Sequence, residues 1–209
     1  MIHGDAQIGG LLVADDDVQL GYADDRGARG PLVLGDDGRL RSGTVLYRGS
    51  VIGDRFATGH HVVVREQCAI GDDVSIWTGT VVDYGVTIGN RVKIHSNCYI
   101  SQYTVIEDGA FLAPGVTLAN DLYPGVEESA ISIRGPQIGA GAQLGVGTTV
   151  LPYVHIGPGA VIGSGSVVTR DIPPGVIAFG NPAVVRRSMS DRDDVRRRVL
   201  AASAERVPW

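Results

Sequence analysis

An aliphatic side chain recurs at every sixth position through the middle of the chain. From Leu34 to Leu118 this column holds Leu, Ile or Val, and only Thr58 departs from it. Glycine repeatedly follows the column residue, as at Gly35 and Gly53. Neither the 3.6-residue spacing of an amphipathic helix nor the alternation of a half-buried strand reproduces this period. A fixed short repeat predicts short strands separated by tight, glycine-bearing corners, with three sixes in each turn of a triangular coil.

Stacking of successive turns gives the physical reason for such a coil. Each turn buries its aliphatic side chains against those of the turns above and below, and no turn is stable by itself. The backbone amides would pair between turns as in a parallel sheet, at about 4.8 Å per turn. Glycine at the corners tolerates positive φ. We therefore expect an all-β chain in which residues eighteen apart lie over one another.

The repeat divides the chain into three predicted parts. Residues 1–33 repeat weakly and carry acidic runs, so we expect an irregular N-terminal turn or cap. Residues 34–185 follow the frame except near 120–137, where a loop is expected to be extruded. Insertions in a solenoid project on one face, often the binding face. Residues 186–209 form a polar tail, in which the string from Ser190 to Asp193 resembles a helix capping box. A short C-terminal α-helix is therefore expected over about 191–206.

Composition and charge argue against two classes of protein, those that bind nucleic acid and those that span a membrane. The net charge of −5 argues against a nucleic-acid-binding face, and the run Arg196-Arg197-Arg198 is most simply a solvated face of the expected C-terminal helix. No apolar run approaches the roughly 18 residues that cross a bilayer, and Met1 is not followed by a signal peptide. We therefore expect a cytoplasmic protein without membrane contact. Cys68 and Cys98 each follow a column residue by four places, so both should point inward from different faces as unpaired thiols.

The six-residue frame resembles that of the left-handed parallel β-helix acyltransferases, and the left hand is implied by this resemblance. Three segments restrict the resemblance to one group of the hexapeptide-repeat superfamily. They are similar to segments of the nucleotide-linked amino-sugar N-acetyltransferases and comprise residues 59–66, 93–100 and 118–124. The resemblance implies acetyl-CoA as co-substrate, no metal, and an amine on a nucleotide-linked sugar as the acceptor. It also implies a homotrimer with active sites between subunits.

The segment Lys93 to Ile100 supplies the first candidate site residues. In the family this segment sits beside the acceptor amine, and its contacting residue corresponds to Asn97. His95 replaces the usual Gln, and it is a candidate general base because imidazole titrates nearest to neutral pH. His61 would lie two turns from Asn97, roughly 10 Å away, and is a candidate substrate contact.

The segment before the extruded loop supplies the second set. Asn120 and Asp121 match the family's Asn-Asp before Tyr-Pro, whereas Ala119 replaces the usual Thr. The resemblance implies that Asp121 holds the amine or takes its proton, while Asn97 orients the amine. Asn120 and Tyr123 are expected to contact the substrate. Whether His95 or Asp121 is the base stays open.

The donor site is inferred in the same way. Residues 162–171 resemble the late-coil segment of these acyltransferases, where the coenzyme A arm lies between two subunits. The resemblance implies that Ser164 offers backbone contacts to the pantetheine amides. It also implies that Thr169, Arg170 and Arg187 face the nucleotide phosphates, where cations are favoured.

Four other functions were compared with this one. An O-acetyltransferase needs a stronger base, and the His of galactoside-type relatives corresponds here to Tyr123. An acyltransferase of a small-molecule biosynthetic pathway would use the same donor. A γ-class carbonic anhydrase needs three zinc histidines, but the corresponding positions hold His61, Asn97 and Gln102. A scaffold protein would bind no coenzyme A. The acceptor, its nucleotide and the acyl chain length are not fixed by the sequence.

Overall fold

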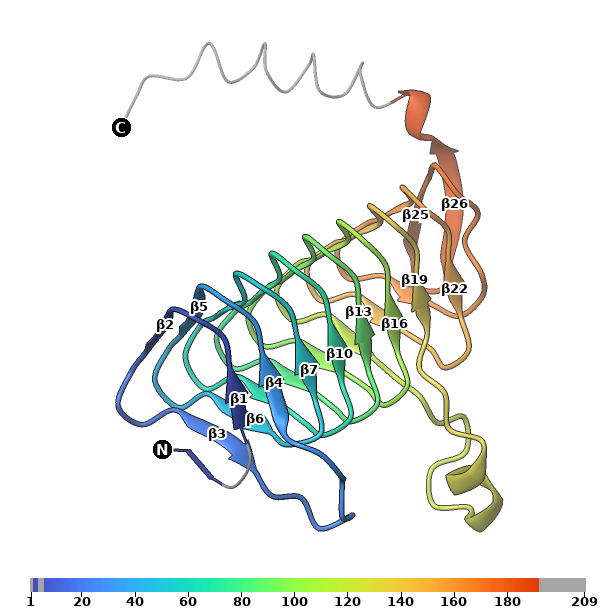
Figure 1. Cartoon of the computed structure of the whole chain (residues 1–209). Helices are drawn as coiled ribbons and strands as arrows, with labels where there is room; N and C mark the ends of the chain where they lie inside the picture. The colour runs from blue at the N-terminus through green and yellow to red at the C-terminus, as the bar shows by residue number, and fades with distance from the viewer. Residues whose placement is uncertain (1, 4–5, 192–209) are drawn as a thin grey trace, which may run out of the picture.

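The aliphatic column lines the interior of a triangular coil in the computed structural model, which describes residues 2–3 and 6–191 (Figure 1). Ile76, Ile94 and Leu112 are each at most 1% exposed. They occupy matching positions in successive strands of one parallel sheet, as their eighteen-residue spacing predicts. Figure 1 shows the chain winding with a left hand from the N-terminal end. The predicted fold class, an all-β left-handed parallel β-helix, is therefore confirmed.

Each turn contributes one strand to each of three faces, which we name A, B and C. Face A contains β3 (Gln19–Tyr22), β6 (Val45–Tyr47), β9 (Val63–Val64), β12 (Val81–Val82), β15 (Tyr99–Ile100), β18 (Thr117–Leu118), β21 (Thr149–Val150) and β24 (Val167–Val168). Face B contains β1 (Ala6–Ile8), β4 (Leu32–Leu34), β7 (Val51–Ile52), β10 (Ala69–Ile70), β13 (Thr87–Ile88), β16 (Val105–Ile106), β19 (Gln137–Ile138) and β22 (His155–Ile156).

Face C is the longest of the three sheets. It contains β2 (Leu12–Ala14), β5 (Gly38–Leu40), β8 (Ala57–Thr58), β11 (Ser75–Ile76), β14 (Lys93–Ile94), β17 (Phe111–Leu112), β20 (Gln143–Leu144), β23 (Val161–Ile162), β25 (Val176–Gly180) and β26 (Ala183–Ser188). All neighbours on this face are parallel except β25 and β26, which form an antiparallel pair. Two short 3₁₀ helices, η1 (Glu127–Ile131) and η2 (Met189–Asp191), complete the elements.

The edges of the prism are named by the faces that they join. In one turn the chain passes through the CA edge at residues 95–98, the AB edge at residues 101–104 and the BC edge at residues 107–110. Left-handed backbone occurs at the corners, for example at Asn97 with φ of 58° and at Gly79 with φ of 72° in the same column. The glycines that directly follow the column residue serve another purpose. A Cβ at Gly35 would clash with the Asp54 carboxylate of the next turn, so these glycines permit close stacking.

The non-repeating segments lie at the ends and on one edge. The N-terminal segment expected to be irregular carries three regular strands, and β1 pairs with β4 at the start of face B. Residues 23–31 and 119–136 both leave the coil at the AB edge, and η1 lies within the second loop (Figure 1). Arg187, placed by the sequence in the tail, lies on β26. The helix expected over 191–206 falls outside the described residues apart from Asp191, which ends η2. Throughout the described ranges, no helix is long and apolar enough to cross a membrane.

Candidate functional site

His95 and Asn97 lie together on the CA edge, directly after β14. Ile94 is buried in the core and fixes the start of the corner. The His95 N–H donates to the Leu112 carbonyl at 2.8 Å, and the Asn97 N–H donates to the Thr78 carbonyl at 2.9 Å. The left-handed backbone of Asn97 directs its side chain over Gly79 of the preceding turn. The corner therefore presents an amide and an imidazole on a rigid, hydrogen-bonded turn.

Two aromatic rings flank the His95 imidazole. The Phe111 ring on β17 lies 4.9 Å from it between centroids, and the Trp77 ring on the preceding turn lies 5.9 Å from it. His95 and Phe111 are half-buried, whereas Trp77 is 48% exposed. The imidazole is thus held between the rings of two neighbouring turns.

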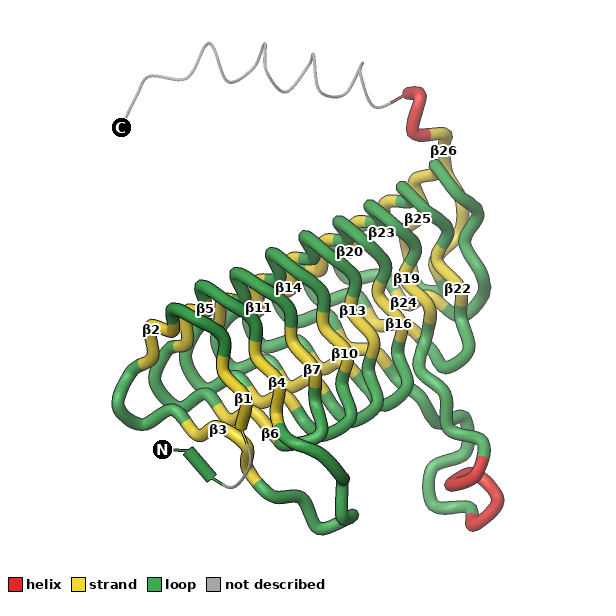
Figure 2. Tube along the Cα trace, in the orientation of Figure 1, coloured by secondary structure: helices red, strands yellow, loops and turns green. Residues whose placement is uncertain are grey.

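A groove begins at Phe111 and follows face C and the CA edge toward the C-terminal end of the coil. Its volume is about 340 Å³, and it is lined by Phe111, Ala113, Gln143, Leu144, Gly145, Val146, Val161, Ile162, Gly163 and Ser164. β20 and β23, which form its floor, are successive strands beyond β14 in Figure 2. Because Phe111 also contacts His95, the groove connects the predicted donor residue Ser164 with the predicted acceptor residues His95 and Asn97.

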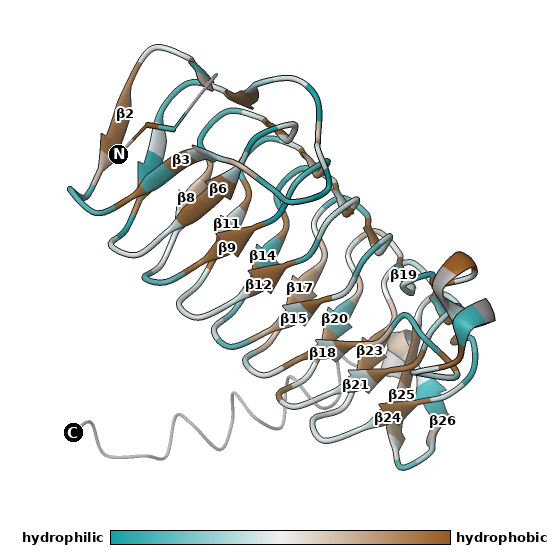
Figure 3. Ribbon diagram, turned by 90° about the horizontal axis from the view of Figure 1, so that it is seen from below, coloured by the Kyte–Doolittle hydropathy of each residue, from teal (hydrophilic) through white to brown (hydrophobic). Residues whose placement is uncertain are grey.

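The second set of acceptor residues lies elsewhere. Asn120 and Asp121 follow β18 and so lie on the AB edge, across face A from Asn97. The Asp121 carboxylate accepts the Ser129 hydroxyl and, at 2.8 Å, the Tyr123 N–H. Asp121 therefore organises the extruded loop of its own chain. Figure 3 looks onto face A, which separates the two edges.

The remaining predicted residues also lie on more than one part of the coil. His61 lies on the CA edge with its ring over Gly43. Thr169 and Arg170 follow β24 on the AB edge and are exposed, and Arg187 is exposed on β26. Within one chain, His61, His95, Asn97 and Ser164 share the CA edge, whereas Asn120, Asp121, Thr169 and Arg170 share the AB edge. The predicted donor set is therefore divided just as the acceptor set is.

A polar network around the buried carboxylate of Asp83 on the AB edge was missed at the level of sequence. Asp83 is 7% exposed and accepts the Tyr99 hydroxyl at 2.8 Å. The Gln102 amide also donates to Asp83, and the Asn120 amide donates to Gln102. Burial, with Asp83 adding to the effect, raises the pKa of Tyr99 to about 12. The eighteen-residue spacing places Gln102 below Asn120, so it could have found that one contact but not those of Asp83.

Glu66 is the other buried acid of the AB edge. It is 1% exposed and accepts two hydrogen bonds from Arg65, at 2.8 and 3.0 Å. Arg26, from the first projecting loop, approaches Glu66 to 3.6 Å and covers the Tyr84 ring at 3.8 Å. These contacts tie the first loop to the coil, so this part of the network is structural.

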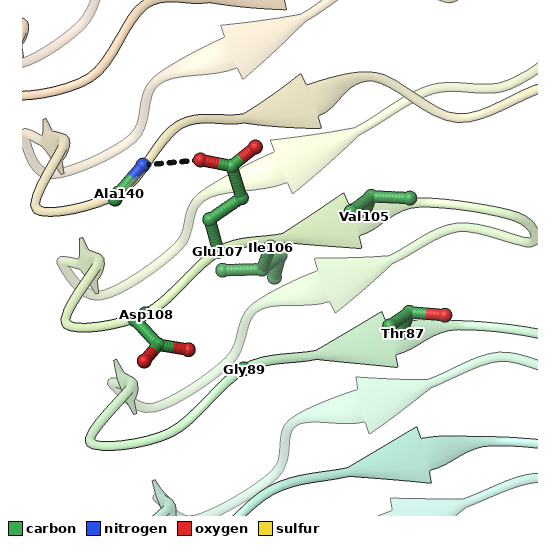
Figure 4. Close-up of a pocket in the computed structure, with 7 residues that line it drawn as sticks. All are labelled: Thr87, Gly89, Val105, Ile106, Glu107, Asp108 and Ala140. Carbon is green, nitrogen blue, oxygen red and sulfur yellow. Dashed lines mark hydrogen bonds between the residues drawn. The ribbon is translucent and has the colours of Figure 1, made fainter.

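A second large hollow lies away from the predicted site residues. Its volume is about 380 Å³, and it opens on face B and the BC edge (Figure 4). The Glu107 carboxylate accepts the Ala140 N–H there at 2.9 Å. In the part of the chain that the structure describes, no group of three or more His, Cys, Asp or Glu side chains could hold a metal ion. Asn97 and Gln102, which the carbonic anhydrase pattern would require as ligands with His61, lie on different edges.

Comparison with known proteins identifies the repeat. Residues 85–120 and 135–170 match the bacterial transferase hexapeptide (six repeats) model, and residues 67–102 match the hexapeptide repeat of succinyl-transferase. The solved UDP-N-acetylglucosamine acyltransferase of Bacteroides fragilis aligns with a TM-score of 0.60 at 17% identity, over 94% of this chain and 75% of that chain. This likeness is one of fold alone.

Two curated relatives are galactoside O-acetyltransferases. The Lactococcus lactis protein is 56% identical over 50 residues, which are 24% of this chain and 24% of that protein. The Escherichia coli protein is 39% identical over 102 residues, which are 45% of this chain and 49% of that protein. The matches therefore span at most about half the length of these relatives.

Proposed function

As a hexapeptide-repeat protein of the bacterial transferase type, this chain presents a rigid coil with a groove along one edge, and we propose that the groove is the donor site of an acetyl-CoA-dependent acetyltransferase. The proposed acceptor is the amine of a nucleotide-linked amino sugar. One observation carries the proposal: Phe111 both contacts His95 and lines the groove that ends at Ser164. Donor and acceptor candidates thus share one edge.

The proposed reaction is a direct attack on the thioester. The amine nitrogen attacks the carbonyl carbon of acetyl-CoA, an N–C bond forms, and the C–S bond breaks to release coenzyme A. The amine must lose one proton, which His95 accepts as general base and returns to the departing thiolate. General-base catalysis of this kind contributes about 10²- to 10⁴-fold. The side-chain oxygen of Asn97 accepts a hydrogen bond from the amine and so orients its lone pair.

Asp121 enters this scheme from a neighbouring copy. Because it lies across face A from Asn97 in its own chain, it can act at the same centre only if the extruded loop reaches the CA edge of another subunit. A homotrimer closed by cyclic symmetry would supply that arrangement three times. The proposed substrate contacts Asn120 and Tyr123 would arrive on the same loop, with His61 contributed by the CA edge.

The polar and cationic residues of the proposed donor site would also act between subunits. Thr169 and Arg170 on the AB edge and Arg187 on β26 are exposed, and their side chains would face the phosphates of a coenzyme A bound between subunits. Acetyl-CoA is the proposed co-substrate, and the chemistry uses no metal. The proposed compartment is the cytoplasm.

A second candidate is acetyl transfer to a hydroxyl, which the names of the two galactoside O-acetyltransferases favour. In that reaction His95 would remove the proton of a sugar hydroxyl, a weaker acid than an ammonium ion. Tyr123 stands where galactoside-type relatives carry a His in the loop, so His95 would be the base. The two candidates differ in the acceptor and share the donor groove.

A thiol-release assay separates the candidates. The protein is supplied with acetyl-CoA and a panel of nucleotide sugars that carry either an amine or a hydroxyl, together with simple galactosides. We expect release only with amines, and His95→Ala should lower kcat by about 10²-fold. Asn97→Gly, which removes the side chain and keeps the left-handed backbone available, should lower kcat by about 10-fold. Release only with hydroxyls would select the second candidate, and no release with any acceptor would remove both.

A further inference from the structure

An exposed tryptophan lies on the side of His95 that faces away from the donor groove. Trp77 is one turn N-terminal to His95 in the same column, and 48% of its surface is exposed. Its indole borders a small hollow of about 40 Å³ lined by Ala57, Thr58, Gly59, Ser75 and Ile76. Ala57 of β8 and Ser75 of β11, which pair in register, supply small side chains at this hollow. A large exposed aromatic ring beside a flat surface is typical of ring-stacking sites.

Lys93 supplies a positive charge next to this surface. It is exposed on β14 and lies in register between Ser75 of β11 and Phe111 of β17. Because its neighbour Ile94 points into the core, Lys93 points outward from face C. Within residues 2–3 and 6–191, it forms no ion pair. The ammonium group is therefore available to an anion between the hollow at Trp77 and the groove at Phe111.

We propose that Trp77 and Lys93 bind the nucleotide part of the acceptor. The nucleobase stacks on the indole, and the diphosphate lies near the Lys93 ammonium group. This inference rests on the proposed function, since it adds the acceptor subsite to that same edge. The nucleobase then lies at Trp77, and the diphosphate and the amine lie on the next turn, at Lys93 and at His95 and Asn97. The acetyl donor lies in the groove from Phe111 onward.

The chain offers a direct spectroscopic test. It contains two tryptophans, Trp77 and Trp209, so the Trp209→Phe variant reports fluorescence from Trp77 alone. Titration of this variant with UDP and with GDP should quench the fluorescence in a saturable way, because every base has a π face. Inorganic pyrophosphate, which carries the charge without the base, should cause no comparable quenching. Saturating coenzyme A should leave the UDP titration unchanged.

Substitutions distinguish the contribution of base stacking on Trp77 from that of the Lys93 charge to UDP binding. Calorimetric binding of UDP should weaken about 5- to 100-fold in Trp77→Ala and should be largely retained in Trp77→Tyr. Lys93→Met should weaken UDP binding and leave uridine binding unchanged. Tyr22→Ala, which removes a ring of similar exposure (41%) on the first turn, is the matched control and should bind UDP normally. Thermal melting of each variant checks that it is folded.

The outcomes distinguish this inference from the proposed function. Quenching by UDP without any acetyl transfer would support the nucleotide site and remove the enzyme activity. Acetyl transfer to a nucleotide sugar with no quenching, and with an unchanged KM in Trp77→Ala, would overturn the nucleotide site and leave the activity. Equal quenching by pyrophosphate, or displacement of UDP by coenzyme A, would likewise overturn it.

Discussion

Thr58 is the one polar residue in the aliphatic column, and its hydroxyl is fully used. It is 7% exposed, accepts the Arg41 N–H at 3.1 Å and lies 2.9 Å from the Thr44 hydroxyl. Thr44 is completely buried and also contacts the Gly59 carbonyl at 3.3 Å. The break in the column is therefore a buried hydrogen-bonded pair that joins successive turns beside the CA edge.

Thr58→Val should destabilise the protein even though it restores the aliphatic column. Valine has the same shape but cannot accept the Arg41 N–H or pair with Thr44, so the free energy of unfolding should fall by about 1 kcal/mol. Urea denaturation of the variant would measure this, with Thr58→Ser as the control that keeps the hydroxyl. Thr44→Val should lower the free energy of unfolding less in the Thr58→Val variant than in the unmodified protein, because the two residues are coupled. A rise in the urea midpoint of Thr58→Val would contradict the interpretation.

Among the elements, the BC edge carries a ladder of Asp and Asn side chains. Each side chain accepts the N–H of the equivalent residue one turn earlier: Asp54 from Asp36 at 2.8 Å, Asp72 from Asp54 at 2.9 Å, Asn90 from Asp72 at 2.9 Å, and Asp108 from Asn90 at 2.8 Å. The next position along the coil is Ala140, which has no side-chain acceptor, so the ladder ends there. A repeated side-chain hydrogen bond thus supplements the backbone pairing between turns.

The ladder should make the coil sensitive to acid. The Asn90 N–H, followed by the Asn90 side chain and Arg91, holds the pKa of Asp108 below its ordinary value of 3.8. A carboxylate with a lowered pKa contributes stability above pH 3.8, and this contribution is lost as the pH falls through the lowered value. Asp108→Asn keeps an acceptor and removes the titration, so its melting temperature should fall less between pH 5 and pH 2 than that of the unmodified protein. Asp16→Asn, an exposed carboxylate outside the ladder, is the control; an identical fall in Asp108→Asn would contradict the argument.

How much of this fold was predictable depends on whether a contact repeats. The register of Ile76, Ile94 and Leu112 followed from spacing alone, because every turn repeats the same burial. The three strands in residues 6–22 lie where the sequence indicated only a weak repeat and an irregular turn, since acidic runs interrupt the pattern there. The contacts of Asp83 with Tyr99 and Gln102 join unlike residues from different columns, so periodicity does not reveal them. The hairpin of β25 and β26 depends on an antiparallel pairing that the hexapeptide frame does not encode.

The candidate site was predictable only in part, because its residues come from different edges of the coil and from a loop without a repeat. Spacing brought His95 and Asn97 to one corner, and the structure adds the groove that links them to Ser164. The extruded loop has no repeat, so its edge and direction could not be derived from the frame. Its placement on the AB edge separates Asp121 from Asn97 by the width of face A. The predicted residues therefore lie in two groups on each chain, one on the CA edge and one on the AB edge.

If each proposed active site combines the two groups from neighbouring subunits, two impaired variants should complement each other. Asn97→Gly alters the group on the CA edge, whereas Asp121→Asn alters the group on the AB edge and retains an acceptor for the Tyr123 N–H. In a random trimer assembled from equal amounts of both, a site between neighbours is intact when one subunit supplies Asn97 and the other supplies Asp121, so about a quarter of the wild-type activity should return. Refolding the two variants together, and separately as the control, followed by thiol-release measurement, tests this. Activity that stays at the level of the separate variants would mean that each site is built within one chain.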